Sequence, residues 1–394
     1  MDWSRIKDGV DGQVKIPKNW ISIHHYEAFN LLFRIENSIR VFAYCVLKAR
    51  LGSRWIDANI STDDAAQGTI GSTGKRRLAQ ANQFKYLGYV SPCPLLYLSM
   101  GELVELMFSE AYWKYFASYF AGKKEIMKSK LDEIIVIRNA FAHFRPLRED
   151  DIDVVRQNAK HVLLGIEDYL SNLTQCDDVV PSNSSDNWYK MLSTIGSEYS
   201  TLQLEQSSNE EWVEVNLRFT PPVINQNLSN TWLDARVIRL DASNVLPLLP
   251  RLTENVVYLT ETLTRGIKDD KFEYSKLLSF TLTRKALDDN GAEIAKSFSE
   301  LVLKISKELE LLTQDDLARG ELLSAVEVFG YWQPQKDDRQ GSWQFSVTKL
   351  ESPPSEDDPP EYWGDLGWLG AEFITKRDKY PWMPSAISGR DFWS

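Results

Sequence analysis

The spacing of apolar residues divides the chain into a helical first part and a second part that mixes strands with helices. Over residues 22–50 apolar side chains recur every three or four positions, which predicts one long amphipathic helix. Ser99 and Glu102 have the spacing of a capping box and begin an aromatic-rich helical segment. Similar spacing predicts helices over 75–86, 125–143 and about 150–170. We therefore expect residues 1–175 to form an all-α bundle of four or five helices.

The pattern changes after residue 175. Residues 176–190, rich in Asp, Ser and Pro, predict a linker. Alternating apolar and polar residues then predict strands over 201–206, 212–220, 235–241 and 277–284. Helical spacing returns over 245–265, 292–312 and 315–327. Residues 191–394 are thus expected to form an α+β domain, which ends in a region rich in Trp and Pro.

Charge is distributed unevenly between these two parts. Residues 1–175 hold 23 basic and 20 acidic residues, whereas the remainder holds 22 and 36. A weakly basic first part suits contact with nucleic acid. The alternative, that the acidic residues only keep the second part soluble, stays open.

The sequence indicates a soluble cytoplasmic protein without a membrane partner. It contains no run of eighteen apolar residues, and its first residues lack the pattern of a signal peptide. Its three cysteines are widely spaced and form neither a zinc-binding pattern nor a disulfide framework. We expect no metal and no cofactor.

A polar motif, Arg138-Asn139 followed by His143, interrupts the apolar helix predicted over 125–143. A helix this apolar should be buried around most of its circumference, so its strong polar groups need partners or a chemical role. Arginine can hold a phosphate, and a histidine with a pKa near about 6.5 can exchange a proton with the 2′-hydroxyl of RNA. Asn139, four residues before His143, could orient the imidazole.

Arg138 and His143 do not share a helix face. They are five residues apart, so about 140° separates them around the helix axis. One phosphate can meet both only if the arginine bends round, the helix end is distorted, or a second copy of the helix completes the site. We favour a groove between two copies.

A second polar cluster, Glu36, Asn37 and Arg40, lies within the helix predicted over 22–50. Glu36 and Arg40 are four residues apart, in the favourable orientation for an ion pair. Either this is an ordinary surface pair, or the cluster faces the motif helix and orients its arginine and histidine.

Cationic residues near the motif are candidates for holding the RNA backbone. They are Lys75, Arg76, Arg77, Lys123, Lys124 and Arg145. Their alternative role is that of solvated surface charges.

The motif and its context resemble the HEPN superfamily (higher eukaryotes and prokaryotes nucleotide-binding). The family signature is an arginine, often followed by a polar residue, and then a histidine after a short spacer late in a helical bundle. Arg138, Asn139 and His143 match this signature with four residues between arginine and histidine, and the Glu36-Asn37-x-x-Arg40 cluster is also similar to the family. The likeness covers about residues 20–175, and the motif context and the Glu36 cluster also resemble HEPN domains of abortive-infection proteins and related defence effectors.

This resemblance implies a metal-independent endoribonuclease that dimerises through the bundle and leaves 2′,3′-cyclic phosphate and 5′-hydroxyl ends. Family toxins that are silenced by a nucleotidyltransferase carry a tyrosine two residues after the histidine, where this chain has Arg145. Control by tyrosine modification is therefore not expected. Residues 191–394 resemble no family. We expect them to sense an activating signal or to regulate the nuclease, with a protein or phage-derived trigger as the partner.

Two other interpretations of the motif remain open at the level of sequence. The helices could form a non-catalytic HEPN module that serves as a dimerisation or nucleotide-binding scaffold. Alternatively, Arg138 could pair with Asp132 or Glu133, while His143 only ends a helix before Pro146.

Overall fold

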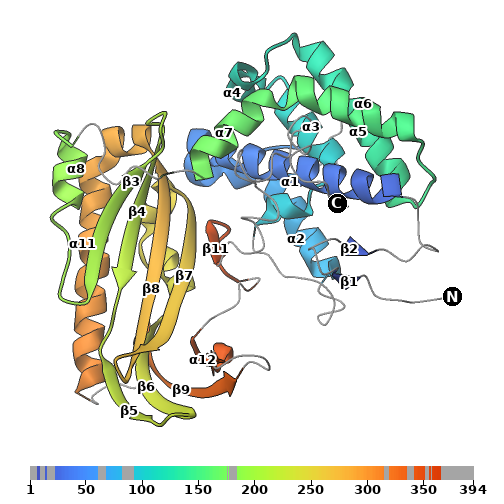
Figure 1. Cartoon of the computed structure of the whole chain (residues 1–394). Coiled ribbons are helices and arrows are strands. Elements are labelled where there is room, and N and C mark those ends of the chain that lie inside the picture. The colour runs from blue at the N-terminus through green and yellow to red at the C-terminus, as the bar shows by residue number, and fades with distance from the viewer. Residues whose placement is uncertain are drawn as a thin grey trace. The chain divides into compact units, whose positions relative to one another are not determined.

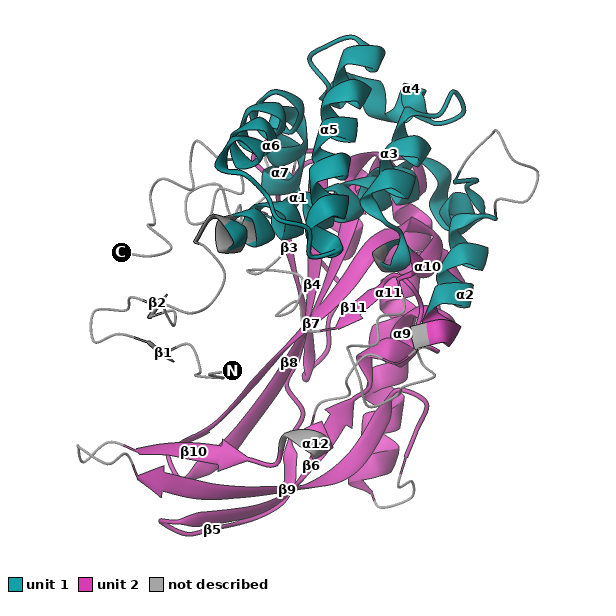
Figure 2. Cartoon of the chain, turned by 90° about the vertical axis from the view of Figure 1, so that its right-hand side faces the viewer, with its two compact units in different colours: residues 1–77, 95–174, 367–394 teal, residues 78–94, 175–366 magenta. Residues whose placement is uncertain are grey.

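The structure is a computed structural model, and it describes residues 7–8, 14–15, 23–60, 68–81, 93–174, 176, 184–314, 319–334, 341–350, 355 and 357–364. The chain forms two compact units (Figure 2). Unit 1 comprises residues 1–77, 95–174 and 367–394, and unit 2 comprises residues 78–94 and 175–366. Helices and β-sheets occur together, so the chain has an α+β fold (Figure 1). Among the described residues, no helix is both long and apolar enough to cross a membrane.

Helices dominate the described part of unit 1. They are α1 (Ile23–Leu51), η1 (Gly52–Asp57), α2 (Ile70–Ala81, which runs on into unit 2), α3 (Met100–Phe108), α4 (Trp113–Phe116), η4 (Ala117–Tyr119), α5 (Lys124–Ala142), α6 (Glu149–Val162) and α7 (Leu164–Thr174). The short 3-10 helix η3 (Pro94–Tyr97) precedes α3, and two short strands, β1 (Lys7–Asp8) and β2 (Val14–Lys15), pair near the N-terminus. The capping box of Ser99 and Glu102 is confirmed at the start of α3. The helix predicted over about 150–170 is instead two helices that meet at Leu163.

α1 is the helix around which the others pack. It contacts α3, α4, α5, α6 and α7, because its apolar positions are buried along most of its length. The ring of Phe42 lies edge-on to Phe116, Tyr119 and Tyr169, with centroids 5.1–5.6 Å apart. Such contacts stabilise a core beyond the area they bury. This packing fixes α1 beside α5 and so positions the two polar clusters.

Unit 2 contains a five-stranded and a four-stranded sheet. The first has the order β11-β7-β8-β4-β3, from β3 (Ser200–Gln206), β4 (Trp212–Phe219), β7 (Val256–Lys268), β8 (Lys271–Thr283) and β11 (Tyr362–Gly364). The second has the order β10-β9-β6-β5, from β5 (Val223–Leu228), β6 (Trp232–Leu240), β9 (Leu323–Pro334) and β10 (Gly341–Phe345). All neighbours are antiparallel except β11 and β7.

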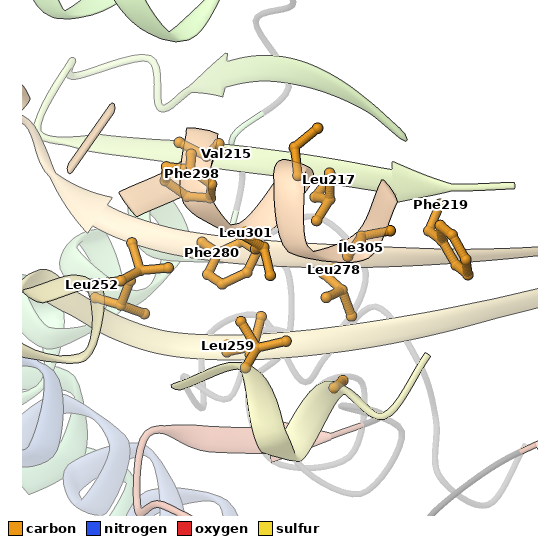
Figure 3. Packing of buried hydrophobic residues seen from close by; sticks show 14 of the residues in the cluster. Val215, Leu217, Phe219, Leu252, Leu259, Leu278, Phe280, Phe298, Leu301 and Ile305 are labelled. Atoms are coloured by element: carbon orange, nitrogen blue, oxygen red, sulfur yellow. The ribbon is translucent and has the colours of Figure 1, made fainter. Parts of the chain in front are cut away.

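The five-stranded sheet packs on the long helix α11 (Arg284–Thr313). Figure 3 shows Leu278 and Phe280 of β8 among Phe298 and Leu301 of α11, and the rings of Phe280 and Phe298 meet edge-on at 5.0 Å. The far end of the β7–β8 hairpin belongs to a second core. There Phe272 and Tyr274 pack with residues of the four-stranded sheet, such as Val328.

Two helix predictions in the second part were wrong. Residues 245–265, which follow η5 (Ala242–Asn244), contain only the short helices α9 (Val245–Leu248) and α10 (Pro250–Asn255) and then strand β7. β7 begins with a continuous buried apolar run, which shows no alternation from which a strand could be predicted. The second wrong prediction is the helix over 315–327. Residues 315–318 lie outside the described residues, and strand β9 begins at Leu323.

Two further helices occur in unit 2. Helix α8 (Asn187–Leu192) begins within the segment predicted as a linker, and α12 (Val347–Leu350) follows β10. α8 packs on α11, where Gly291 lies so close to Trp188 that a Cβ would be 2.7 Å from the Trp188 side chain.

Candidate functional site

Helix α5 is buried on one side only, and Arg138, four residues after Ile134, lies on that side, whereas Asn139 and His143 are exposed. Its buried residues are Met127, Leu131 and Ile134, and it contacts α1, α3 and α6. Val136, on another face, is 68% exposed. The expectation that the motif helix is buried around most of its circumference is therefore wrong for the single chain.

Arg138 forms a two-point ion pair with Glu36 of α1. Its Nε donates to Glu36 Oε2 at 2.7 Å, and its Nη2 donates to Glu36 Oε1 at 3.1 Å. The Glu36 side chain is 8% exposed and that of Arg138 is 28% exposed. This fork-to-fork geometry is the strong form of an arginine–carboxylate contact. It brings together the two polar clusters that the sequence identified, 102 residues apart.

A second arginine binds the same carboxylate. Arg40 donates to Glu36 Oε1, to Asn37 Oδ1 at 2.6 Å and, through Nε and Nη2, to the Leu98 carbonyl at 3.1 and 3.0 Å. Burial lowers the pKa of Arg40 below its usual range; Glu36 opposes this shift, and the charge of Arg138 adds to it. Two guanidinium groups thus share one carboxylate, and the cluster carries one net positive charge. Such a surplus attracts an anion such as phosphate.

His143 ends α5 in a Schellman motif. The Phe144 N–H donates to the Phe141 carbonyl at 2.9 Å, and the Arg145 N–H donates to the Ala140 carbonyl at 2.9 Å. Phe144 adopts the left-handed backbone conformation, with φ of 56°, and its side chain is 98% exposed. His143 is also exposed, and its ring has no hydrogen bond to a described residue. No described residue binds the imidazole, so within the described part of the chain it is open to a substrate at the helix end.

The motif residues are connected differently from what the sequence suggested. Asn139 does not orient the imidazole: its Oδ1 accepts a hydrogen bond from Arg138 Nη1 at 3.2 Å. The carboxylate partner of Arg138 is Glu36, and not Asp132 or Glu133. Within the described chain no hydrogen bond or ion pair joins His143 to Arg138, so one chain holds the two groups apart.

Several candidate RNA-binding cations already have protein partners. Arg77 donates to the Tyr97 carbonyl and to Glu102, with Nη1 2.7 Å from Glu102 Oε2. Lys124 pairs with Glu110 and lies over the ring of Trp113. By contrast, four are exposed and make no hydrogen bond or ion pair with a described side chain. They are Lys75, Arg76, Lys123 and Arg145.

Two features of the site had no usable signal in the sequence. The Leu98 carbonyl, which fixes Arg40, is a backbone group from a distant segment, and every residue carries such a group. The left-handed conformation of Phe144 falls on a residue type that rarely adopts it, so only the position before Arg145-Pro146 hinted at a helix end.

Comparisons with known proteins give no relative for this chain. No protein-family model matches it, and neither a curated protein nor a solved structure is detectably similar. Among the described residues, no group of three or more His, Cys, Asp and Glu side chains is arranged to hold a metal ion.

Proposed function

We propose that the chain is a metal-independent endoribonuclease of the HEPN type that acts as an effector in antiviral, abortive-infection-type defence. The observation that carries this proposal is the Glu36–Arg138–Arg40 cluster, which joins α1 to α5 with a surplus positive charge, together with the exposed imidazole of His143 at the end of α5. In this view unit 1 is a HEPN-like helical bundle. Unit 2 senses or regulates, with a protein or phage-derived trigger as its partner.

The reaction needs two proton transfers and one anion site. The RNA 2′-oxygen loses its proton to an imidazole and bonds to the adjacent phosphorus. The bond from phosphorus to the 5′-oxygen breaks, and that oxygen takes a proton from an imidazolium. The products are a 2′,3′-cyclic phosphate and a 5′-hydroxyl. Arg138 stabilises the charge that builds on the non-bridging oxygens, because Glu36 holds its guanidinium in a fixed orientation.

A homodimer would supply the two imidazoles and bring them to one phosphate. Exposed apolar side chains near the motif support such an interface. Val136 is 68% exposed and Phe29 is 55% exposed, and the Phe29 ring lies 5.7 Å from Phe33 and 6.1 Å from Phe141. Exposed apolar groups that gather at one place are typical of protein contact surfaces.

The direct test is cleavage of single-stranded RNA by the purified full chain in EDTA, with the 3′ ends of the products identified as cyclic phosphates. His143→Ala should abolish cleavage. His161→Ala is the matched control, since His161 is another histidine of unit 1, on α6, and lies 3.3 Å from Lys130 Nζ. In a composite site that needs an imidazole from each copy, adding His143→Ala chains to wild type should lower cleavage by more than dilution does, because each mixed dimer keeps only one imidazole. Cleavage by His143→Ala at the wild-type rate would refute the proposal.

The alternative, a non-catalytic HEPN scaffold, has one observation in its favour. Arg138 already donates to Glu36 and Asn139, as it would in a purely structural role. A scaffold predicts a stable dimer or stoichiometric nucleotide binding, without RNA cleavage under any activating condition. Measuring dimer mass, nucleotide binding and cleavage on one preparation separates the two functions.

A further inference from the structure

A pocket in unit 2 lies between strand β5 and the far end of the β7–β8 hairpin. Its volume is about 790 Å³, which falls in the range of small-molecule sites. The end of β4 and the connection to β5 complete its wall, through residues such as Arg218 and Thr220. We call this concavity the hairpin pocket.

The hairpin pocket is basic, although the second part of the chain is strongly acidic. Four basic residues line it, Arg218, Arg265, Lys268 and Lys271, with Glu273 as the one acidic residue of the lining. Arg218, Lys268 and Lys271 make no ion pair with any described carboxylate, whereas most arginines in unit 2 do, such as Arg239 with Asp241 at 2.8 Å. Cations gathered in a concave surface raise the local concentration of anions.

Two of these cations face each other across the hairpin. Lys268 and Lys271 are direct cross-strand partners on either side of the two-residue turn Asp269-Asp270. Like charges directly opposite in an antiparallel pair are destabilising. The turn acids have left-handed φ values of 48° and 58° and do not line the pocket. The two lysines form no ion pair with a described carboxylate, so a bound anion would lower the repulsion between them.

The pocket is held open by hydrogen bonds within the protein. Gln226 of β5 donates from Nε2 to the Asp270 carbonyl at 3.0 Å and accepts from the Phe272 N–H at 2.9 Å. This amide ties β5 to the tip of the hairpin. Phe272 and Tyr274, which alternate with Lys271 and Glu273 along β8, are buried in the second core and anchor this end of the hairpin. A preformed site loses less entropy when a ligand binds.

We propose that the hairpin pocket binds a small polyphosphate-bearing ligand of nucleoside-triphosphate size. Arg218, Lys268 and Lys271 hold the phosphates, because they make no ion pair with a described carboxylate and a polyphosphate carries several charges. This site is independent of the proposed RNA cleavage, and the experiment that tests it measures only ligand binding.

Isothermal titration of the full chain in EDTA, with ATP and with inorganic tripolyphosphate, tests the proposal. Wild type should bind both, and added salt should weaken the binding. In the double variant Lys268→Glu/Lys271→Glu the dissociation constants should rise at least about tenfold. The matched control is Lys190→Glu/Lys307→Glu, which makes the same change in charge at two exposed lysines of unit 2 outside the pocket. That control should bind as wild type does.

The single variant Lys268→Glu tests the proposal if the double variant folds poorly. Lys268→Glu turns the repulsive pair with Lys271 into an attractive one, so the unliganded protein should melt at a higher temperature while tripolyphosphate raises its melting temperature less than that of wild type. The proposal is overturned if neither ATP nor tripolyphosphate binds wild type. It is also overturned if the pocket variants and the control lose affinity equally.

Discussion

The guanidinium of Arg138 and the carboxylate of Glu36 form two hydrogen bonds, of 2.7 and 3.1 Å, between helices α5 and α1. Arg40 uses the same carboxylate from within α1. Glu36 is therefore the acceptor that makes two nearby positive charges compatible with a largely buried position. The contact links the packing of unit 1 to the electrostatics of the candidate site.

Replacing Glu36 with Gln should destabilise unit 1 by about 2 kcal/mol. The change leaves two guanidinium groups without a counter-charge, and removing one partner of a buried ion pair costs more than removing a surface pair. The value is below that of a fully buried pair because the Arg138 side chain is 28% exposed. Hydrogen exchange of peptides from α1 and α5 measures the effect.

Glu105→Gln is the control for this prediction. Its carboxylate pairs with Lys128 at 2.8 Å, but its side chain is 54% exposed, so the loss should stay below about 0.5 kcal/mol. Equal protection of α1 in the two variants would mean that Glu36 carries no special electrostatic role.

Phe144→Gly should stabilise the end of α5 by up to about 1 kcal/mol. Phe144 has φ of 56° at the position of a Schellman motif that glycine favours, and its exposed ring contributes no packing within the chain. Phe144→Ala keeps a Cβ and therefore the strain, so its stability should be close to that of wild type. Thermal melting of both variants separates backbone strain from the effect of the ring.

If Phe144 instead contacts RNA or a second copy of the chain, the two variants share a different outcome. Both would then lose RNA cleavage or dimer mass while remaining folded. A strained residue beside a candidate catalytic group is where such a role is expected.

The elements that the sequence predicted well are helices whose apolar residues recur every three or four positions. α1 and α5 begin and end within a few residues of the predicted bounds, because their apolar residues repeat with the helical period. β7 was missed because Val256, Val257 and Leu259 follow one another in a strand buried on both faces. A periodicity argument cannot distinguish such a run from a buried helix.

For the candidate site, the sequence identified the residues but not their contacts. The spacing of Glu36 and Arg40 predicted their ion pair, which the structure contains. The contact of Glu36 with Arg138 depends on how α1 and α5 pack, so the sequence also left Asp132 and Glu133 open as partners of Arg138. Long-range pairs of this kind follow from tertiary packing, and a single sequence carries no direct signal for them.

Glu102 should make the stability of unit 1 sensitive to acid. Burial acts to raise the pKa of Glu102, but hydrogen bonds from Arg77 and Ser99 outweigh it and bring the pKa below its ordinary value of 4.5. A carboxylate whose pKa is lower in the folded state stabilises the fold above its unfolded pKa and loses this contribution as pH falls through the folded value. Unit 1 should therefore lose stability below about pH 4.5.

The variant Glu102→Gln tests this linkage. It should melt below wild type at pH 7, by an amount that corresponds to about 1–2 kcal/mol, because the capping box and the ion pair with Arg77 are both weakened. At pH 3 the two proteins should differ much less. If the two proteins differ in melting temperature by the same amount at pH 7 and pH 3, the loss of stability comes from packing and not from the charge of Glu102.

Gly165→Ala should destabilise unit 1 by about 2 kcal/mol or more, because α7 approaches η4 too closely to admit a side chain. A Cβ on Gly165 would lie 2.1 Å from the Tyr119 carbonyl oxygen and 2.9 Å from its carbon, and backbone atoms cannot rotate away. Gly101→Ala is the matched control, since its Cβ would meet only Ser99 Oγ at 4.0 Å within a helix. That change should stabilise α3 by about 0.5–1 kcal/mol. Urea unfolding of the two variants should therefore shift in opposite directions, and a common direction would show that α7 can move away from η4 at little cost.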